Sequence, residues 1–219
     1  MASTRKNVDE RVVEDFGKEW KTFNQEGLSG EVLHNAFNQY FHLFPFHKIN
    51  AQSVGFDMGC GSGRWAKLMA PRVGTLNCID PSPAALNQAR ANLEKQQNCT
   101  FECASVSGST LANASQDFGY CLGVLHHIPD TLDGLKCCAD KLKRGAPFLL
   151  YLYYRFDNKP LWFKAIWKAS DIVRKGVSAL PFPAKLLVSQ LIALSVYWPL
   201  SRLSWLLEKM GIDISNIPL

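Results

Sequence analysis

The pattern of apolar and polar positions divides the chain into three regions, and the first predicts helices. Over residues 8–49, apolar residues recur three or four positions apart, with glycines at 27 and 30 between two such runs. We therefore predict two amphipathic helices in this region. Their apolar faces are formed by Val12, Val13, Phe16, Trp20 and Phe23 in the first, and by Val32, Leu33, Phe37, Tyr40 and Phe41 in the second.

The second region, residues 53–154, alternates short apolar runs with amphipathic stretches of helical length. This alternation is typical of βαβ units around a parallel sheet. The predicted strands are 53–58, 75–80, 99–104, 118–124 and 147–154, and the predicted helices are 63–72, 82–96 and 131–143. Ser82 is a suitable N-cap for the second of these helices, because Pro83 follows at the first helical position. The fold class is therefore α/β, with a doubly wound sheet.

The third region, residues 160–210, is helical in pattern and rich in Trp, Leu and Lys. We expect breaks at Gly176, at Pro181 with Pro183, and at Pro199. Its most apolar run is interrupted by Pro199 well short of the ~20 residues that span a bilayer, so no transmembrane helix is expected. The predicted organisation is a ligand-binding domain over 1–155, which includes helices 8–49, and a helical lid or oligomerisation appendage over 156–219.

Composition narrows the class of protein. The 219 residues are 47% hydrophobic and 20% charged, which excludes wholesale disorder, a collagen and a polytopic membrane protein. The net charge of +5 is too mild to indicate a nucleic-acid partner, and none is expected. Nearly all of this excess lies in residues 156–219, where eight basic residues face four acidic ones.

The cysteines and the N-terminus bear on the cellular compartment. The seven cysteines show no C-x-x-C spacing, so we expect reduced thiols and no metal site. Residues 1–19 are charged throughout and lack the apolar segment of a signal peptide. We therefore expect a cytoplasmic protein.

The strongest chemical signal is a glycine loop after the first predicted strand. Gly59, Gly61 and Gly63 stand at alternate positions and lead into a helix, which allows a tight turn and leaves backbone N–H groups at the helix start. Asp80 ends the next strand, 21 positions after Gly59, where a carboxylate can reach the two hydroxyls of a ribose. Together these features predict a site for an adenosine-like ligand.

Asp57 helps to choose among such ligands. It stands two residues before the first glycine, and a carboxylate there would repel the pyrophosphate of a dinucleotide. A ligand with an ammonium and a sulfonium group and no phosphate suits the loop better. A nucleotide-dependent oxidoreductase remains the alternative enzyme, and a truncated, inactive cofactor-binding module is the alternative outside enzymology.

Four motifs, ordered along residues 50–155, carry a family resemblance. They are Asp57 to Gly63, Asp80, Asp117-Phe118-Gly119-Tyr120, and the run from Leu122 to Asp130. In these motifs the chain resembles the class I S-adenosylmethionine-dependent methyltransferases, in particular their small-molecule branch, which includes the quinone-biosynthesis C-methyltransferases. The resemblance implies a mostly parallel Rossmann-like sheet in the order 3-2-1-4-5. It also implies S-adenosylmethionine as methyl donor, S-adenosylhomocysteine as product, and in-line transfer to a small-molecule acceptor.

The resemblance also assigns a cofactor site. The methionine half would be lined by Asp57, Gly59, Cys60, Gly61, Gly63, Leu122 and Gly123, and the ribose would be held by Asp80 beside Pro81. The adenine would lie against Ala104, Ser105 and Val106, where Ser105 replaces the acidic residue of many relatives. Arg64 is a candidate partner for the terminal carboxylate or for a surface ion pair. Trp20 and its neighbours Phe16 and Phe23 are candidates either for a cap over the cofactor or for core packing.

His126 and His127 follow the fourth predicted strand at the carboxyl edge of the sheet, where ligands bind in open α/β folds. Either imidazole could take a proton from the acceptor, and we prefer His127 as that base. The alternative is structural, because the pair may only begin the next helix. Tyr153, Tyr154 and Arg155 end the fifth strand on the acceptor side, or pack against the helices that follow.

The third region departs from the family pattern. Relatives complete the sheet with a sixth and a seventh strand, whereas residues 156–219 show no such strands, so the chain looks truncated. The edge at strand five would then need cover from helices 160–210 or from a second copy. Lysines beside tryptophans in this region also allow a peripheral membrane or lipid contact. A solvated basic face over a packed apolar stripe is the alternative.

Overall fold

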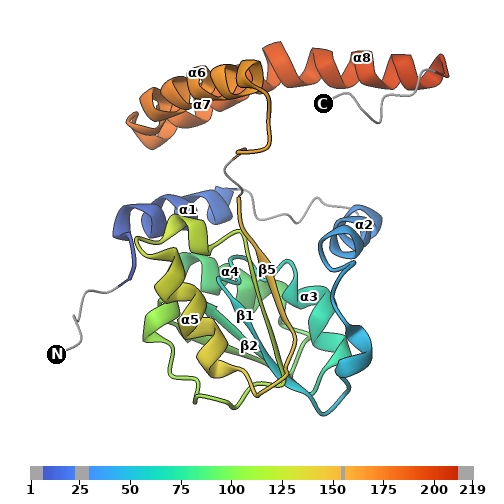
Figure 1. The fold of residues 1–219 in the computed structure, drawn as a ribbon, viewed down its shortest axis with the longest axis vertical. Coiled ribbons are helices and arrows are strands. Elements are labelled where there is room, and N and C mark those ends of the chain that lie inside the picture. The colour runs from blue at the N-terminus through green and yellow to red at the C-terminus, as the bar shows by residue number, and fades with distance from the viewer. Residues whose placement is uncertain (1–6, 23–29, 154–155, 212–219) are drawn as a thin grey trace. The chain divides into compact units, whose positions relative to one another are not determined.

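The computed structural model describes residues 7–22, 30–153 and 156–211, and it divides into two compact units, 1–154 and 155–219. Figure 1 shows the order of the elements in each unit. Each unit is described by itself below. Phe23, Tyr154 and Arg155 lie outside the described residues, as does the side chain of Trp20.

The first unit is built on a sheet of five parallel strands. Their order is β3-β2-β1-β4-β5, which confirms the predicted α/β fold and strand order. The strands are β1 (Val54–Met58), β2 (Thr75–Asp80), β3 (Cys99–Cys103), β4 (Phe118–Leu122) and β5 (Phe148–Tyr151). Each predicted strand is therefore present, and four of the five are one to four residues shorter than predicted.

Glycines let the two central strands pack large rings against the sheet. Gly55 of β1 pairs with Phe118 of β4, and an added Cβ at Gly55 would lie 2.2 Å from the Phe118 ring. The reverse holds one position on, where a Cβ at Gly119 would lie 2.3 Å from the ring of Phe56. Each phenylalanine therefore fills the space above a glycine of the neighbouring strand, once on each face of the sheet.

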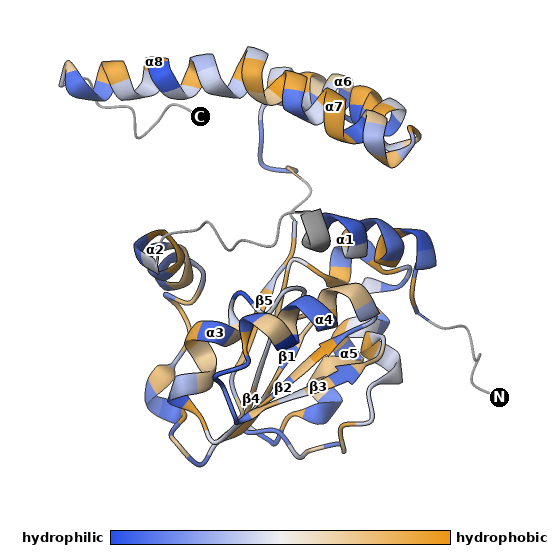
Figure 2. Ribbon diagram, turned by 180° about the vertical axis from the view of Figure 1, so that it is seen from behind, coloured by the Kyte–Doolittle hydropathy of each residue, from blue (hydrophilic) through white to orange (hydrophobic). Residues whose placement is uncertain are grey.

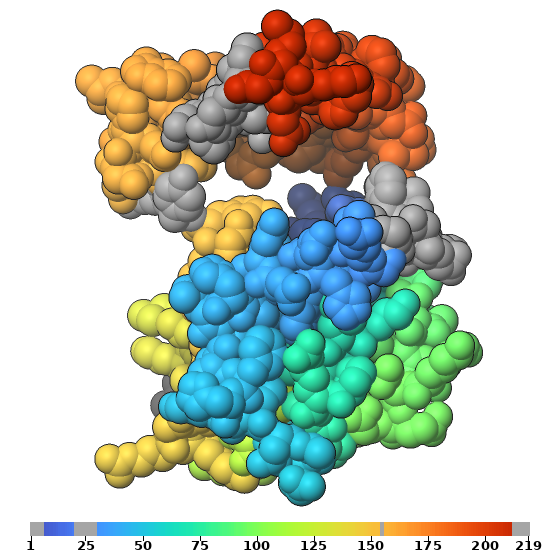
Figure 3. Space-filling view, turned by 90° about the vertical axis from the view of Figure 1, so that its right-hand side faces the viewer, coloured from blue at the N-terminus to red at the C-terminus, as the bar shows by residue number. Residues whose placement is uncertain are grey.

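Helices cover both faces of the sheet, which confirms the doubly wound arrangement. One face packs against α2 (Gly30–Tyr40), α3 (Ala66–Met69) and α4 (Pro83–Asn92), and its core includes Phe37, Trp65, Met69, Leu86 and Tyr120. The other face packs against α5 (Thr131–Lys141), and its core includes Phe56, Met58, Ile79, Leu125 and Cys138. Figure 3 shows α2 and the segment after it, in blue, covering one side of this unit.

The N-terminal helix α1 (Glu10–Thr22) packs on α4. Gly17 permits this approach, because a Cβ there would lie 2.6 Å from Ser82 Oγ. Ser82 is the predicted N-cap of α4, and its Oγ accepts a hydrogen bond from Ala85 N at 3.4 Å. The two predicted N-terminal helices and the cap are therefore confirmed, and α1 is held over the start of α4.

The predicted helix 63–72 is wrong in its first three residues. Residues 61–65 form turns, and only α3 and the 3-10 turn η2 (Ala70–Arg72) are helical. The reason is the positive φ of Gly61 and Gly63, +54° and +78°, which is incompatible with a continuous right-handed helix. The glycine loop is therefore longer than the sequence pattern predicts.

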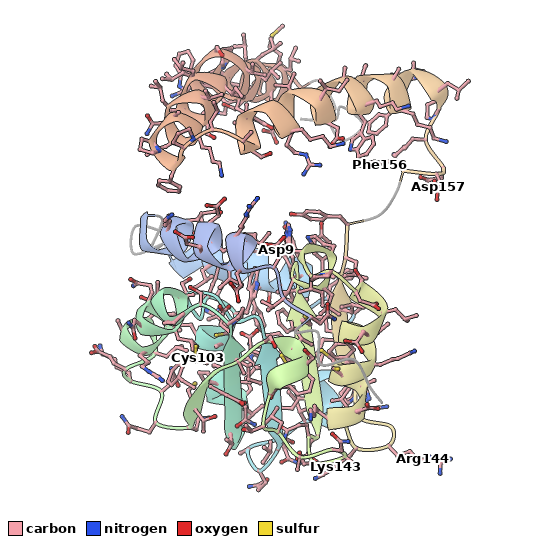
Figure 4. The ribbon with its side chains drawn as sticks, turned by 90° about the vertical axis from the view of Figure 1, so that its left-hand side faces the viewer. Asp9, Cys103, Lys143, Arg144, Phe156 and Asp157 are labelled. Atoms are coloured by element: carbon pink, nitrogen blue, oxygen red, sulfur yellow. The ribbon has the colours of Figure 1, made fainter. Side chains whose placement is uncertain are left out.

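The second unit is helical, with fewer breaks than expected. Its elements are α6 (Leu161–Ser178), α7 (Phe182–Ile192), the π-helical turn η5 (Ala193–Tyr197) and α8 (Trp198–Lys209). The predicted break at Pro181 is present, but α6 continues through Gly176, and α7, η5 and α8 are consecutive through Pro199. Figure 4 labels Phe156 at the start of this unit, where its ring lies 5.3 Å from Phe163.

The π turn explains why Pro199 does not end the helix. Proline lacks an N–H and disturbs the regular i to i−4 ladder, and a π turn directly before it supplies an altered ladder. Residues 182–209 therefore form 28 consecutive helical residues, long and apolar enough by length and composition to cross a membrane. The interruption at Pro199 on which we based the expectation of no transmembrane helix is absent, and the expectation itself stays a prediction.

Candidate functional site

A hollow lies at the carboxyl edge of the sheet in the first unit. Its volume is about 130 Å³, and it continues into open solvent. The ends of β1, β2, β3 and β4 form its floor, and the segment that leads into α1 forms a wall. Its lining comprises Asn7, Val8, Asp9, Val12, Val13, Phe16, Met58, Gly59, Asp80, Pro81, Ser82, Ala104, Ser105, Val106, Leu122, Gly123, Val124, His127 and Ile128.

Nine of the residues expected to bind the cofactor or act in catalysis line this hollow. They are Gly59, Asp80, Pro81, Ala104, Ser105, Val106, Leu122, Gly123 and His127. The remainder with described side chains, namely Asp57, Cys60, Gly61, Gly63, Arg64 and His126, lie outside the lining. The residues at the strand ends thus line the hollow together, whereas Gly59 is the one expected loop residue that does so.

Backbone hydrogen bonds to β2 and within the loop hold the glycine loop in place. Gly59 N and Cys60 N both donate to Ile79 O, at 2.7 and 3.0 Å, and Gly63 N donates to Cys60 O at 2.9 Å. Gly59 has a φ of +79°, and a Cβ there would lie 2.3 Å from Val124 Cγ2. Since these amides already have acceptors, they are not available to cradle a phosphate, contrary to our expectation of free N–H groups.

Asp80 joins the loop to the wall of the hollow. Its Oδ2 accepts from Gly61 N and its Oδ1 accepts from Ser82 N, both at 2.9 Å. Burial raises the pKa of this carboxyl, and the two backbone donors oppose the rise. Each carboxylate oxygen keeps a second lone pair, so Asp80 can still accept hydrogen bonds from a ribose while the backbone holds it in place.

Asp57 does not line the hollow, and its expected place beside the methionine half stays a prediction. Alternation along β1 turns Met58 into the hollow and Asp57 toward the opposite face of the sheet, where its side chain is 2% exposed. Its Oδ2 and the hydroxyl of Tyr120 are both buried and make no hydrogen bond of good geometry. Burial raises the pKa of Asp57 to about 8, and the polar hydroxyl of Tyr120 close by partly offsets this rise. Asp57 is therefore mostly protonated at neutral pH.

Three further loop residues pack against their neighbours and do not line the hollow. A Cβ at Gly63 would lie 2.8 Å from Leu93 Cδ1, so Gly63 allows the end of α4 to approach. Cys60 is 6% exposed, and its thiol contacts Gly61 O at 3.8 Å. Arg64 lies with its guanidinium 4.2 Å from the Trp65 ring centre, its Nε is buried without a partner, and burial lowers its pKa.

The two histidines occupy different places. His127 lines the hollow, and its ring meets that of Phe16 of α1 edge to face at 5.0 Å. His126 instead stacks on Tyr153, with ring centres 4.0 Å apart. Both of its ring nitrogens are buried without a hydrogen-bond partner, and burial together with the charge of His127 lowers the pKa of His126 to about 4. His126 is therefore neutral at pH 7.

Aromatic rings continue from His126 along the same edge of the sheet. Tyr153 meets Tyr151 at 6.0 Å, Tyr151 meets Tyr40 of α2 at 5.3 Å, and Tyr40 meets Trp65 at 4.8 Å. We call Tyr40, Tyr151, Tyr153 and His126 the aromatic row. The tyrosines are partly exposed, at 38%, 42% and 66%, so the row presents ring faces and edges to solvent. This is a surface on which a planar molecule can stack.

Sequence reasoning missed the segment before α1. Asn7 is 6% exposed, donates from Nδ2 to Asp130 O at 2.7 Å and to Asp133 Oδ2 at 2.9 Å, and accepts from Asp130 N at 2.8 Å. Asp9, labelled in Figure 4, caps α1 by accepting from Arg11 N at 3.0 Å. An asparagine in a charged stretch carries no local signal for partners 123 residues away, whereas Asp9 before an apolar-periodic run is a readable N-cap.

The charges of the hollow favour a cation. Asp9 and Asp80 contribute two carboxylates to the lining, and the lining residues in the described part of the chain include no Lys or Arg. Most other lining side chains are apolar. A pyrophosphate would meet two carboxylates and no counter-charge, whereas a sulfonium nucleoside would meet complementary charge. Among the described residues there is also no group of three or more His, Cys, Asp or Glu side chains that could hold a metal ion.

Comparison with protein-family models identifies the domain. The model of the family described as "Methyltransferase domain" matches residues 56–150, from within β1 to within β5. Among curated relatives, the ubiquinone biosynthesis O-methyltransferase of Idiomarina loihiensis is 31% identical over 147 residues, which are 59% of this chain and 59% of that protein. The enzyme of the same name from Acinetobacter baylyi is 28% identical over 126 residues, covering 50% and 53%. The chain thus spans little more than half the length of these relatives.

Solved structures show the same fold. The YcgJ protein of Bacillus subtilis superimposes with a TM-score of 0.51 and 21% identity, covering 57% of this chain and 53% of that one. Phosphoethanolamine N-methyltransferase 1 of Haemonchus contortus, solved with phosphoethanolamine and S-adenosylhomocysteine, gives 0.50 and 12%, covering 62% and 31%. The strand order, the glycine loop and the family match agree on a methyltransferase domain over residues 56–150.

Proposed function

We propose that this chain binds S-adenosylmethionine in the hollow and transfers its methyl group to a small-molecule acceptor. The observation that carries the proposal is the charge of the lining, which has two carboxylates and no basic side chain in the described residues, beside a glycine loop whose amides are already bonded. Such a site accepts a cationic nucleoside and opposes a pyrophosphate. The cofactor supplies an activated methyl group, so the protein's main task is to position it.

The lining residues divide the task of binding. Asp80 is placed to accept hydrogen bonds from the ribose hydroxyls, and its anchors at Gly61 and Ser82 keep it oriented without the ligand. Ser105 and Val106, at the end of β3, border the place for the adenine. Leu122 and Gly123 flank the methionine part.

The acceptor would be positioned by His127 and by the aromatic row, at the carboxyl end of the sheet. His127 lines the hollow and is the residue that can reach a proton on the acceptor, while Phe16 packs against its ring. The aromatic row begins at His126 and offers ring surface on which a planar acceptor could stack. Holding the nucleophile in line with the methyl group is worth as much as ~7–11 kcal/mol in favourable intramolecular reactions, so proximity would do most of the catalysis.

The first test compares ligands. Isothermal titration calorimetry should detect binding of S-adenosylmethionine and of S-adenosylhomocysteine, and no binding of NAD⁺ at the same concentration. Tight binding of NAD⁺ with no heat from S-adenosylmethionine would overturn the proposal in favour of an oxidoreductase.

The second test concerns turnover. Transfer of radiolabelled methyl from S-adenosylmethionine should be measured against hydroxylated quinone precursors and against phosphoethanolamine, because relatives are named for ubiquinone biosynthesis O-methylation and for phosphoethanolamine N-methylation. Transfer to one of these classes would support a small-molecule enzyme. Cofactor binding with no transfer to any of them would support a cofactor-binding module.

A further inference from the structure

The second unit exposes an unusual amount of apolar surface for a helical assembly. None of the residues in α6, α7, η5 or α8 is buried. Leu161 is 83% exposed, Ile172 71% and Tyr197 69%. Figure 2 shows hydrophobic and hydrophilic residues alternating along α8. Helices of a globular protein normally bury an apolar stripe, so these helices need an apolar partner outside the unit.

Helix α6 has two distinct faces. Trp162, Ile166 and Val173 lie on one side at helical spacing, and all three are at least 60% exposed. The opposite side carries a polar stripe, whose members are Lys164, Lys168, Asp171 and Lys175. Asp171 is paired with both Arg174 and Lys175, which neutralises the acid within this helix. The polar side of α6 is therefore basic.

The long helix of α7, η5 and α8 has an uncharged centre between basic ends. Residues 186–201 carry no charge, and Lys185 and Arg202 flank them. At 1.5 Å per residue this centre is roughly 24 Å long, shorter than the ~30 Å hydrocarbon core of a bilayer. It also contains Ser189, Gln190 and Ser195. These properties suit a helix that lies in the membrane surface better than one that spans it.

Charge selects the partner. Residues 156–211 contain eight Lys/Arg and three Asp/Glu, so the helical unit is strongly basic. A second copy would bring the same positive charge to the interface and would be repelled, whereas anionic lipid headgroups attract it at about 1 kcal/mol per basic residue. The aromatic residues of the unit include Trp162, Trp167, Tyr197, Trp198 and Trp205, whose amphipathic rings favour the headgroup level.

We propose that the helical unit, residues 156–211, docks on an anionic lipid bilayer, with its helices in the plane of the membrane surface. The apolar side of α6 and the uncharged centre of the long helix face the acyl chains, and the lysines face the headgroups. The proposal does not depend on methyl transfer, so it can hold or fail independently of the proposed function.

The test is vesicle flotation of the full chain at 150 mM salt. It should float with vesicles of phosphatidylcholine and 30% phosphatidylglycerol, and at least tenfold less with pure phosphatidylcholine. Four of the six tryptophans lie in the unit, so tryptophan emission should shift to shorter wavelength on binding. Binding to neither kind of vesicle overturns the proposal, as does a stable dimer in ultracentrifugation that does not bind vesicles.

A charge-matched pair of variants locates the contact. Ile166→Glu with Val173→Glu should abolish flotation, because two carboxylates would enter the acyl region. Lys95→Glu makes the same change in net charge on an exposed residue of the first unit, and should leave flotation unchanged. Circular dichroism confirms that the variants keep their helices. Equal flotation of both variants overturns the contact, and resistance to carbonate extraction would show a spanning helix and overturn the in-plane mode.

Discussion

At the scale of single residues, the site depends on how each carboxylate is held. Asp80 is anchored by two backbone amides and faces the hollow, whereas Asp57 has an unpartnered oxygen and faces away from it. Asp80 can thus bind a ligand, whereas Asp57 affects the stability of the fold, because the two side chains lie on different sides and only Asp80 has backbone donors. Binding and stability can therefore be separated by mutation.

Asp80→Asn should weaken binding of S-adenosylmethionine. The amide offers one acceptor oxygen instead of two, so either the backbone anchor or the ribose contact is lost, at a cost of about 1.5–3 kcal/mol or roughly 10- to 150-fold in Kd. Calorimetry measures this directly. Glu94→Gln is the matched control on an exposed residue, and its Kd should equal that of the wild type. Unchanged affinity of the Asp80 variant would remove this residue from the site.

The histidines should separate in a pH profile. If His127 removes the acceptor's proton, His127→Asn should lower kcat by about 10²–10⁴-fold and remove the acidic limb of the profile, with little change in the Kd of the cofactor. His126→Phe should keep both kcat and that limb, because the pKa of His126 is already about 4 and its ring only stacks on Tyr153. Wild-type turnover of both variants across the pH range would exclude general-base catalysis and leave proximity alone.

At the scale of elements, α1 is the part of the first unit that covers the hollow. The side chains of Val12, Val13 and Phe16 line it, and Asn7 fixes the start of the segment to the beginning of α5. Asp9 caps the helix. The wall formed by α1 is therefore held along the helix by packing on α4 and at its start by the hydrogen bonds of Asn7.

Asn7→Ala should loosen this wall. The variant loses three hydrogen bonds and leaves Asp130 N without its acceptor, so cofactor binding should weaken by about 1–3 kcal/mol, or 5- to 150-fold in Kd. Hydrogen exchange of the amides in α1 should quicken at the same time. Asn113→Ala removes an exposed asparagine that bonds only to Lys141 among the described contacts, and neither readout should change. Slow exchange in α1 with normal affinity would refute the tether.

Several elements could be predicted from the sequence because their causes are local. The cap at Ser82, the glycine loop and the five apolar strands each have a signal within a few residues. The place of Asp57 could also have been read from alternation along β1, since Phe56 and Met58 share the opposite side. Asn7 could not, because its partners are distant in sequence, and the continuation through Pro199 depends on a π turn without a sequence signature.

At the scale of the whole molecule, Asp57 couples global stability to pH. Its pKa is about 8 in the folded chain and about 3.9 when unfolded, so the folded state holds the proton more tightly. The free energy of unfolding therefore falls as pH rises between about 4 and 8, and does so no further above that range. Over this window the folded chain keeps Asp57 protonated while the unfolded chain ionises it, and this costs the fold more stability as the pH rises.

Asp57→Asn should remove that cost. The amide is neutral and of the same size, so the variant should exceed the wild type in stability by about 5 kcal/mol at pH 8, at about 1.4 kcal/mol per pKa unit, and by little at pH 4. Urea unfolding at several pH values measures the difference. Asp117→Asn should behave in the opposite way, because its pKa is lowered by Lys143 and by the amide of Val54: it destabilises above about pH 4 and is neutral below. A pH-independent difference at Asp57 would contradict the buried charge.

The hydrogen bonds of Asn7 also determine when the hollow can form as the chain is synthesised. Its two partners, Asp130 and Asp133, are made more than 120 residues later. Until they leave the ribosome, the first helix has no fixed end and the ligand hollow lacks a wall. The hollow therefore cannot close before the fourth strand and the helix after it have emerged, so a ligand that needs this wall can be enclosed only after most of the domain has been translated.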